Sequence, residues 1–142
     1  MNLCLLLRIA SIITLLFAVG HSMGAPWTPV NEAAPASVVE AMKSVSFDAM
    51  GSRRTFWDFY FGFGVSISIY LFAQTAVLWL VATLAKAQPD AARPFVVVLL
   101  IAYAVNIYVT WQYFFVIPLV LSIVMVTCLA LALIASRSRA RT

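Results

Sequence analysis

The residues best suited to bind a ligand lie at the ends of apolar segments. His21 is the only histidine and lies near the end of the first such segment, while Arg54 and Asp58 precede the second at the i, i+4 spacing of a helical ion pair. Because imidazole titrates near neutrality, His21 could relay protons or bind a ligand. Alternatively it donates to a carbonyl or to Asp58 and fixes helix packing. With Trp27 and Trp111 these residues form our hypothetical ligand-binding set.

No catalytic motif accompanies this set. A single histidine excludes a bis-histidine haem and a His-rich zinc site. Cys4 and Cys128 belong to no CxxC motif, which favours buried free thiols. The glycines Gly62 and Gly64 lack the strand, the spacing and the lysine of a phosphate-binding loop. We therefore expect no catalytic residue, no metal and no cofactor, and a membrane redox enzyme is the weakest functional hypothesis.

A second group of residues suits contacts between helices. Two pairs of small residues at four-residue spacing, Gly62 with Ser66 and Gly64 with Ser68, allow close approach of a neighbouring helix. The amides of Gln74 and Asn106 lie within long apolar runs, where they need hydrogen-bond partners. We expect all six to be packing residues, with a transport path as the alternative for the amides.

The distribution of charge indicates which elements carry these residues. Of the 142 residues, 64% are hydrophobic and 10% charged, and the mean hydropathy is +1.02. Residues 9–31, 59–85 and 94–136 contain no Lys, Arg, Asp or Glu. A helix needs about 20 apolar residues to cross roughly 30 Å of hydrocarbon, so the first two stretches suit one crossing each and the third suits two. The net charge of +4 comes from basic residues that lie beside these apolar stretches, and this position argues against nucleic-acid binding.

The expected fold is all-α, a four-helix transmembrane bundle forming a single domain over residues 1–142. We place the spans at about 3–23, 60–86, 93–111 and 115–136. The second helix should begin earlier, near Thr55, and end before Pro89. Pro94 suits the first position of the third span, and Pro118 suits the first turn of the fourth.

The first span has two interpretations. Arg8 before an apolar run, with small residues at Ser22 and Gly24, resembles a cleavable signal peptide. The apolar residues 3–7 make a poor charged leader, however, and Arg8 can snorkel from a helix that begins before it. We favour a retained helix and leave cleavage open.

The basic residues predict an orientation. With both termini in the cytoplasm, six basic residues face the cytoplasm and three face the exterior, which agrees with the positive-inside rule. The loop of residues 25–54 is then exterior. Within it, Ser37 and Glu40 have the spacing of a capping box, and an amphipathic helix is expected from about Ser37 to Met50, where Gly51 ends it.

The layout resembles the small four-span bacterial membrane proteins called DoxX-like, in which a Gly-His pair closes the first span. The matching residues are Gly20 and His21, followed by the aromatic segment 58–64. The resemblance implies a bacterial inner-membrane location and this architecture, and it implies no particular activity.

Two functional hypotheses follow. In the first, the protein is a non-enzymatic structural or partner-binding component of the lipid bilayer, which stabilises or binds another membrane protein, or a second copy of itself, through its glycine-serine face. In the alternative, it binds or carries a lipid-like or quinone-like ligand in an outer-face pocket around His21, Arg54 and Asp58.

Overall fold

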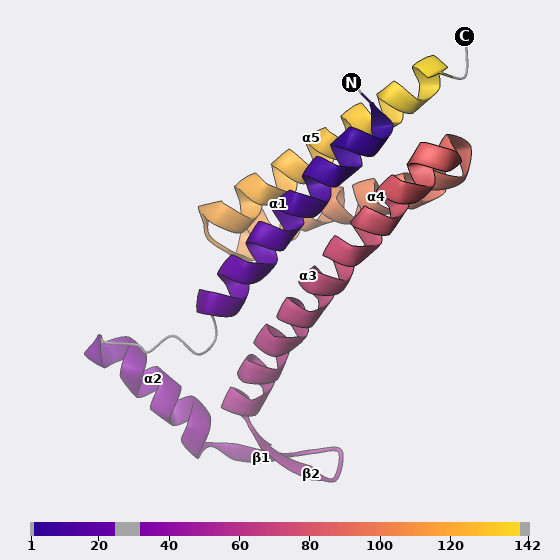
Figure 1. Ribbon diagram of the computed structural model, residues 1–142. Coiled ribbons are helices and arrows are strands. Elements are labelled where there is room, and N and C mark those ends of the chain that lie inside the picture. Colours follow the sequence, from indigo (N-terminus) through magenta and orange to yellow (C-terminus); the bar gives the residue numbers. More distant parts are fainter. Residues whose placement is uncertain (1, 25–31, 140–142) are drawn as a thin grey trace. The chain divides into compact units, whose positions relative to one another are not determined.

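The computed structural model describes residues 2–24 and 32–139, which are largely helical (Figure 1). In chain order the elements are α1 (Leu3–Gly24), α2 (Ala33–Ser44), β1 (Ser46–Ala49), β2 (Ser52–Thr55), α3 (Phe56–Ala87), α4 (Pro89–Tyr113) and α5 (Val116–Arg139). Helices α1, α3, α4 and α5 are long and apolar enough to cross a membrane. The four predicted spans are thus confirmed as helices of suitable length and hydropathy, the pattern of a multi-pass membrane protein.

The prolines mark the helix boundaries, with one correction. Pro118 lies in the first turn of α5, as predicted, but α4 begins at Pro89 and not near Pro94. Only Gln88 separates α3 from α4, so Pro89 takes the first helical position, where its missing N–H costs no hydrogen bond. Pro94 lies inside the helix.

The chain divides into two compact units. Residues 1–17 and 72–142 form the first, and residues 18–71 form the second.

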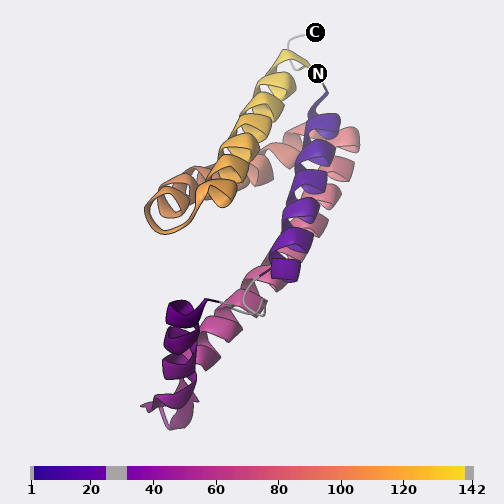
Figure 2. The same cartoon turned by 90° about the vertical axis from the view of Figure 1, so that its left-hand side faces the viewer.

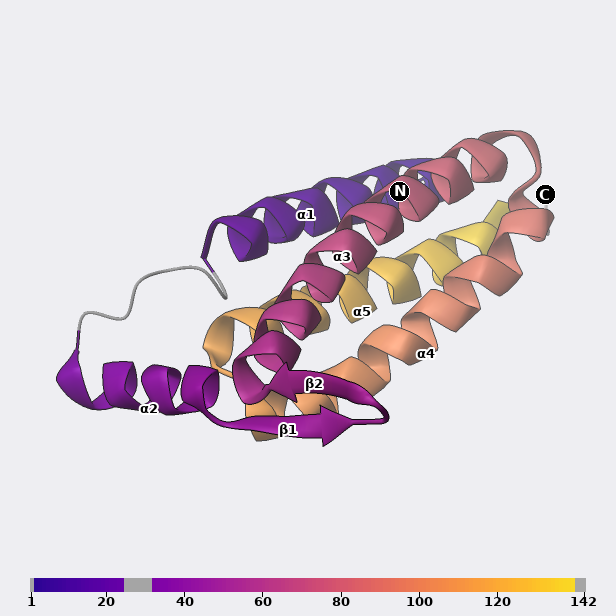
Figure 3. The same ribbon diagram turned by 90° about the horizontal axis from the view of Figure 1, so that it is seen from below.

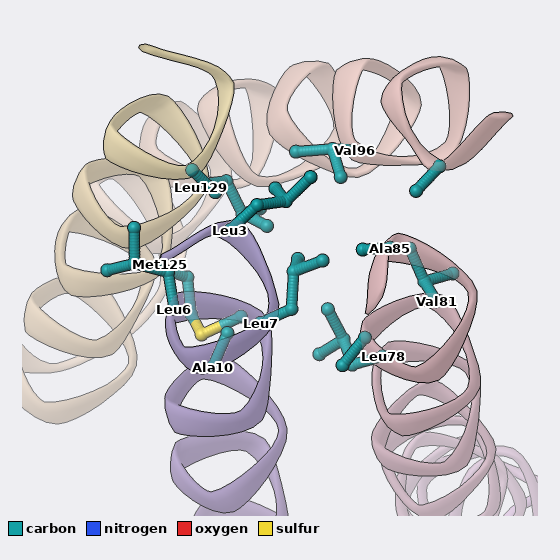
Figure 4. Close-up of a cluster of buried hydrophobic side chains, with 13 residues drawn as sticks. Leu3, Leu6, Leu7, Ala10, Leu78, Val81, Ala85, Val96, Met125 and Leu129 are labelled. Atoms are coloured by element: carbon teal, nitrogen blue, oxygen red, sulfur yellow. The ribbon is translucent and has the colours of Figure 1, made fainter. Parts of the chain in front are cut away.

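In the first unit, leucines and alanines of α1 and α3 form the hydrophobic core together with residues of α4 and α5. Leu7 and Ala10 of α1 and Leu78 of α3 are completely buried (Figure 4). Val96 of α4 and Leu129 of α5 complete the same cluster. The alanines keep the helix axes close, which increases the van der Waals contact that holds apolar helices together.

Two residues, Phe114 and Phe115, join α4 to α5. Such a short connection makes the two helices antiparallel neighbours. The start of α1 and the end of α5 lie at the same end of this unit, as Figures 1 and 2 both show.

In the second unit, α2 leads into an antiparallel hairpin of β1 and β2, which continues into α3 (Figure 3). The predicted helix over residues 37–50 is therefore wrong in extent, because α2 occupies 33–44 and strand β1 follows. The predicted capping box is also wrong. Glu32 precedes the first helical residue, and the Glu40 carboxylate lies 3.2 Å from Lys43 Nζ. Phe47 of β1 packs on rings of α3, and this contact favours a strand over further helix.

The hairpin turn explains the role of Gly51. Met50 and Gly51 have φ angles of 54° and 86°, the left-handed values that a two-residue type I′ turn needs at both positions. The Asp48 carboxylate accepts a 2.7 Å hydrogen bond from the Gly51 N–H and closes the turn. Glycine adopts this conformation without strain, whereas a fully exposed methionine does not.

Replacing Met50 with asparagine should therefore stabilise the hairpin. Asparagine tolerates positive φ, and relief of the strain should contribute up to about 1 kcal/mol. Hydrogen exchange of the backbone amides of residues 46–55 should slow by about fivefold. Gly51→Ala, the opposite change, should accelerate it. Equal exchange in wild type and Met50→Asn would contradict the strained turn.

Candidate functional site

A hydrogen-bonded cluster joins three helices of the first unit near the middle of their apolar runs. Tyr103 of α4 donates from its hydroxyl to Gln74 Oε1 of α3 at 3.1 Å. The same hydroxyl lies 3.4 Å from Thr14 Oγ1 of α1. Thr14 is buried and donates to the Ala10 carbonyl one turn earlier at 2.9 Å. The phenol of α4 thus donates to α3 and lies against the Thr14 hydroxyl of α1.

Two further bonds extend this pattern. Ser11 of α1 donates to the Thr75 carbonyl of α3 at 2.9 Å, beside the cluster. Asn106 of α4 donates to Ser122 Oγ of α5 at 2.9 Å, within the α4 and α5 hairpin. Gln74 and Asn106, which the sequence singled out as packing residues, therefore each bond to a neighbouring helix.

The chemistry available in this cluster is hydrogen bonding between helices. Its groups are hydroxyls, an amide and backbone carbonyls, and the described contacts bring no carboxylate or imidazole to it. A proton-transfer or nucleophilic step would need such a base next to a hydroxyl. The arrangement therefore fixes the positions of the helices and offers no catalytic pair.

At the end of α1, His21 has a partner on α3. Its Nδ1 lies 3.1 Å from Ser68 Oγ, and Ser68 is buried. This contact makes Ser68, one of the predicted small packing residues, a hydrogen-bonding residue as well. The sequence suggested a carbonyl or Asp58 as the partner of His21, and the structure places a hydroxyl of α3 within hydrogen-bond distance of its ring.

Asp58 and Thr55 together cap the N-terminus of α3. The Asp58 Oδ2 accepts a 2.7 Å hydrogen bond from the Thr55 N–H, and the Asp58 N–H donates to Thr55 Oγ1 at 3.1 Å. This reciprocal pair is a capping box, and it satisfies two backbone donors at the helix start. Arg54 lies in β2 and donates to the Arg53 carbonyl at 2.8 Å, so helical i, i+4 spacing does not apply to Arg54 and Asp58.

Aromatic rings surround the junction of the hairpin with α3. The Phe47 ring lies 4.8 Å from that of Phe56 and 5.6 Å from that of Phe59. Lys43 of α2 lies over the Trp57 ring at 5.2 Å, a cation–π distance. These contacts hold the hairpin and α2 against the start of α3.

The remaining predicted site residues are dispersed. Trp27 lies outside the described residues. Trp111 belongs to the first unit, where it is 67% exposed and contacts the Tyr108 ring edge-on. Gly62 is exposed, while Gly64 and Ser66 are half-buried. Apart from its chain neighbours and the nearby backbone of its own helix, no described atom lies within 4 Å of where a Gly62 Cβ would be.

Sequence reasoning missed several contacts that the structure shows. Thr14 and Ser11 were not singled out, although their i, i+3 spacing places both hydroxyls on one face of an otherwise apolar helix. Arg8 was expected only to snorkel. It stacks on Trp79 of α3, with the guanidinium carbon 3.4 Å from the ring centroid, and donates to Thr83 Oγ1 at 3.1 Å.

Comparison with protein-family models, curated proteins and solved structures gives no match to this chain.

Removing the two halves of the Tyr103 and Gln74 bond should show that they act together. Tyr103→Phe and Gln74→Leu should each destabilise the protein, and the double variant should cost less than their sum by about 0.6 kcal/mol. Unfolding of the purified protein in mixed micelles measures these energies. Tyr108→Phe is the matched control, because Tyr108 lies on the same helix but is 60% exposed. Strict additivity of the two changes would contradict the bond.

Thr55→Ala and Asp58→Ala should both loosen the first turn of α3. Loss of the threonine cap should cost about 1 kcal/mol at the helix start, and backbone amides of residues 56–59 should exchange faster in both variants. Arg54→Ala should leave this exchange unchanged. Unchanged exchange in Asp58→Ala would contradict the capping role of its carboxylate.

Proposed function

We propose that the protein is a non-enzymatic, multi-pass component of a bacterial inner membrane that binds another membrane protein, or a second copy of itself, through α3. The observation that carries this proposal is the uncovered Gly62 surface. Gly62 is exposed, and no described atom approaches its Cβ position. Small residues such as Gly62 and Ser66 allow the backbone of another membrane helix to approach closely. In the described part of this chain, no other helix packs against Gly62.

The neighbours of Gly62 suit such a contact. Phe59 and Phe63 are 41% and 65% exposed on the same helix. Phe59 precedes Gly62 by three residues and Phe63 follows it directly, so large apolar side chains flank the small residue, a combination that suits contact with a partner helix. Aromatic rings supply large contact areas at low cost in side-chain entropy.

The proposed location and orientation rest on charge and on resemblance. Six basic residues near the termini and the α3 to α4 turn favour the cytoplasm for both ends. An even number of crossings agrees with this arrangement, as does the position of the start of α1 and the end of α5 at one end of the first unit. The bacterial inner membrane follows from the DoxX-like layout.

The alternative function, a carrier with an outer-face pocket, has weaker support. Such a pocket would use His21, Arg54 and Asp58 together. The Asp58 carboxylate accepts from the backbone of Thr55, and His21 contacts Ser68. To bind a ligand, Asp58 and His21 would each have to give up the hydrogen-bond partner described here.

Gly62→Leu tests the proposed interface. Because Gly62 is exposed and a Cβ there meets no described atom beyond its chain neighbours and its own helix backbone, the variant should fold as the wild type does. It should nevertheless abolish the complex, since a leucine holds the partner helix away from α3. Native mass spectrometry of the protein purified in mild detergent reports the mass of the complex and of any bound small molecule.

Gly20→Leu is the matched control. Gly20 is also an exposed helical glycine with no described atom within 4 Å of its Cβ position. The complex should survive this change. A wild-type protein that is always monomeric, or a Gly62→Leu variant that keeps its partner, would overturn the proposal.

A further inference from the structure

Arg8 of α1 is a charged side chain without an acidic partner. Within residues 2–24 and 32–139 the ion pairs join Lys43 with Glu40 and Arg93 with Asp90, and no carboxylate pairs with Arg8. Arg8 is only half-buried and is the sixth residue of α1, about 7.5 Å along the helix from its start at Leu3. A charge at this depth of a membrane helix requires a counter-charge or water.

The Arg8 guanidinium is nevertheless held in one position. It stacks on the Trp79 ring at 3.4 Å and donates from Nη2 to Thr83 Oγ1 at 3.1 Å. A guanidinium has five N–H donors, and these contacts use one of them. Its planar fork matches the oxygens of a phosphate, which it binds through two parallel hydrogen bonds.

A second cation lies at the same end of the helix pair. Lys86 is exposed and follows Thr83 by three residues, so it lies on the same face of α3 one turn closer to the helix end. The Arg8 contacts to Trp79 and Thr83 fix this end of α3 beside the start of α1. Arg8 and Lys86 therefore place two positive charges at the same end of the helix pair.

The surfaces around Arg8 are apolar and exposed. Leu5 and Ile12 precede and follow Arg8 by one turn on α1 and are 52% and 50% exposed. On α3, Leu80 beside Trp79 is 67% exposed. A phosphate held by Arg8 would thus have hydrocarbon surface on both helices for attached acyl chains.

We propose that Arg8, Trp79, Thr83 and Lys86 form a binding site for an anionic phospholipid. The phosphodiester accepts from the Arg8 guanidinium, Lys86 adds a second positive charge near the same headgroup, and the acyl chains lie along Leu5, Ile12 and Leu80. A phospholipid fits better than free phosphate because the site combines fixed cations with apolar surface. The site requires the membrane location proposed above but not the partner at Gly62.

Titration of the full-length protein in mild detergent with phosphatidylglycerol, followed by native mass spectrometry, tests the site. Arg8→Gln keeps hydrogen-bond donors for Thr83 but removes the charge, and it should weaken phosphatidylglycerol binding about fivefold. Lys86→Gln, at an exposed position that cannot disturb the core, should weaken it to a similar extent. Lys43→Gln, which removes a cation from the second unit, should have no effect.

Two comparisons establish the chemistry of the ligand. Phosphatidylcholine, whose phosphodiester charge is balanced by its choline cation, should bind the wild type more weakly than phosphatidylglycerol does, and excess inorganic phosphate should not displace phosphatidylglycerol. Phosphatidylglycerol binding that is unchanged in both Arg8→Gln and Lys86→Gln would overturn the site, even where the complex at Gly62 is intact. Loss of the complex in Gly62→Leu with unchanged lipid binding would leave the site standing.

Discussion

Polar side chains in helices this apolar must find their hydrogen-bond partners within the protein, and the contacts between helices depend on how they do so. Thr14 and Ser122 each donate to the carbonyl oxygen one turn earlier on their own helix. This local bond orients the hydroxyl and leaves its oxygen able to accept. Asn106 donates to the Ser122 oxygen, and the Tyr103 hydroxyl lies beside that of Thr14. The polar contacts between helices therefore involve hydroxyl groups that are oriented by a hydrogen bond to the backbone of their own helix.

The same constraint accounts for the apolar contacts around these bonds. Between lipid-exposed helices the hydrophobic effect contributes little, so close packing and directed bonds must hold them together. Ala10 and Ala82 are completely buried in the core of the first unit, where small side chains let the backbones approach. Close approach in turn brings Ser11 within 2.9 Å of the Thr75 carbonyl. Packing of small residues and hydrogen bonding thus reinforce each other. Arg8 likewise combines packing on the Trp79 ring with a hydrogen bond to Thr83.

The sequence was sufficient for the four long helices because their signal, a long run without charge, depends on local composition alone. It was insufficient for residues 45–55, where short apolar spacings fit both a helix and a strand. The contact that decides between them is Phe47 on the rings of Phe56 and Phe59, which is tertiary. The turn at Met50 and Gly51 could have been recognised only from the glycine, because methionine is atypical at positive φ.

For the candidate site, the sequence indicated which residues lie at the ends of the apolar segments, but not which of their side chains contact each other. The contact of His21 with Ser68 joins residues 47 positions apart, and no local pattern specifies it. Asp58 differs, since Thr55 and Asp58 carry the local signature of a cap. The expected i, i+4 ion pair would require α3 to include Arg54, whereas α3 begins at Phe56 and Arg54 acts on Asp58 only as a nearby positive charge. An exposed ion pair gains little in water, while the cap satisfies two backbone N–H groups, so the carboxylate serves the helix start.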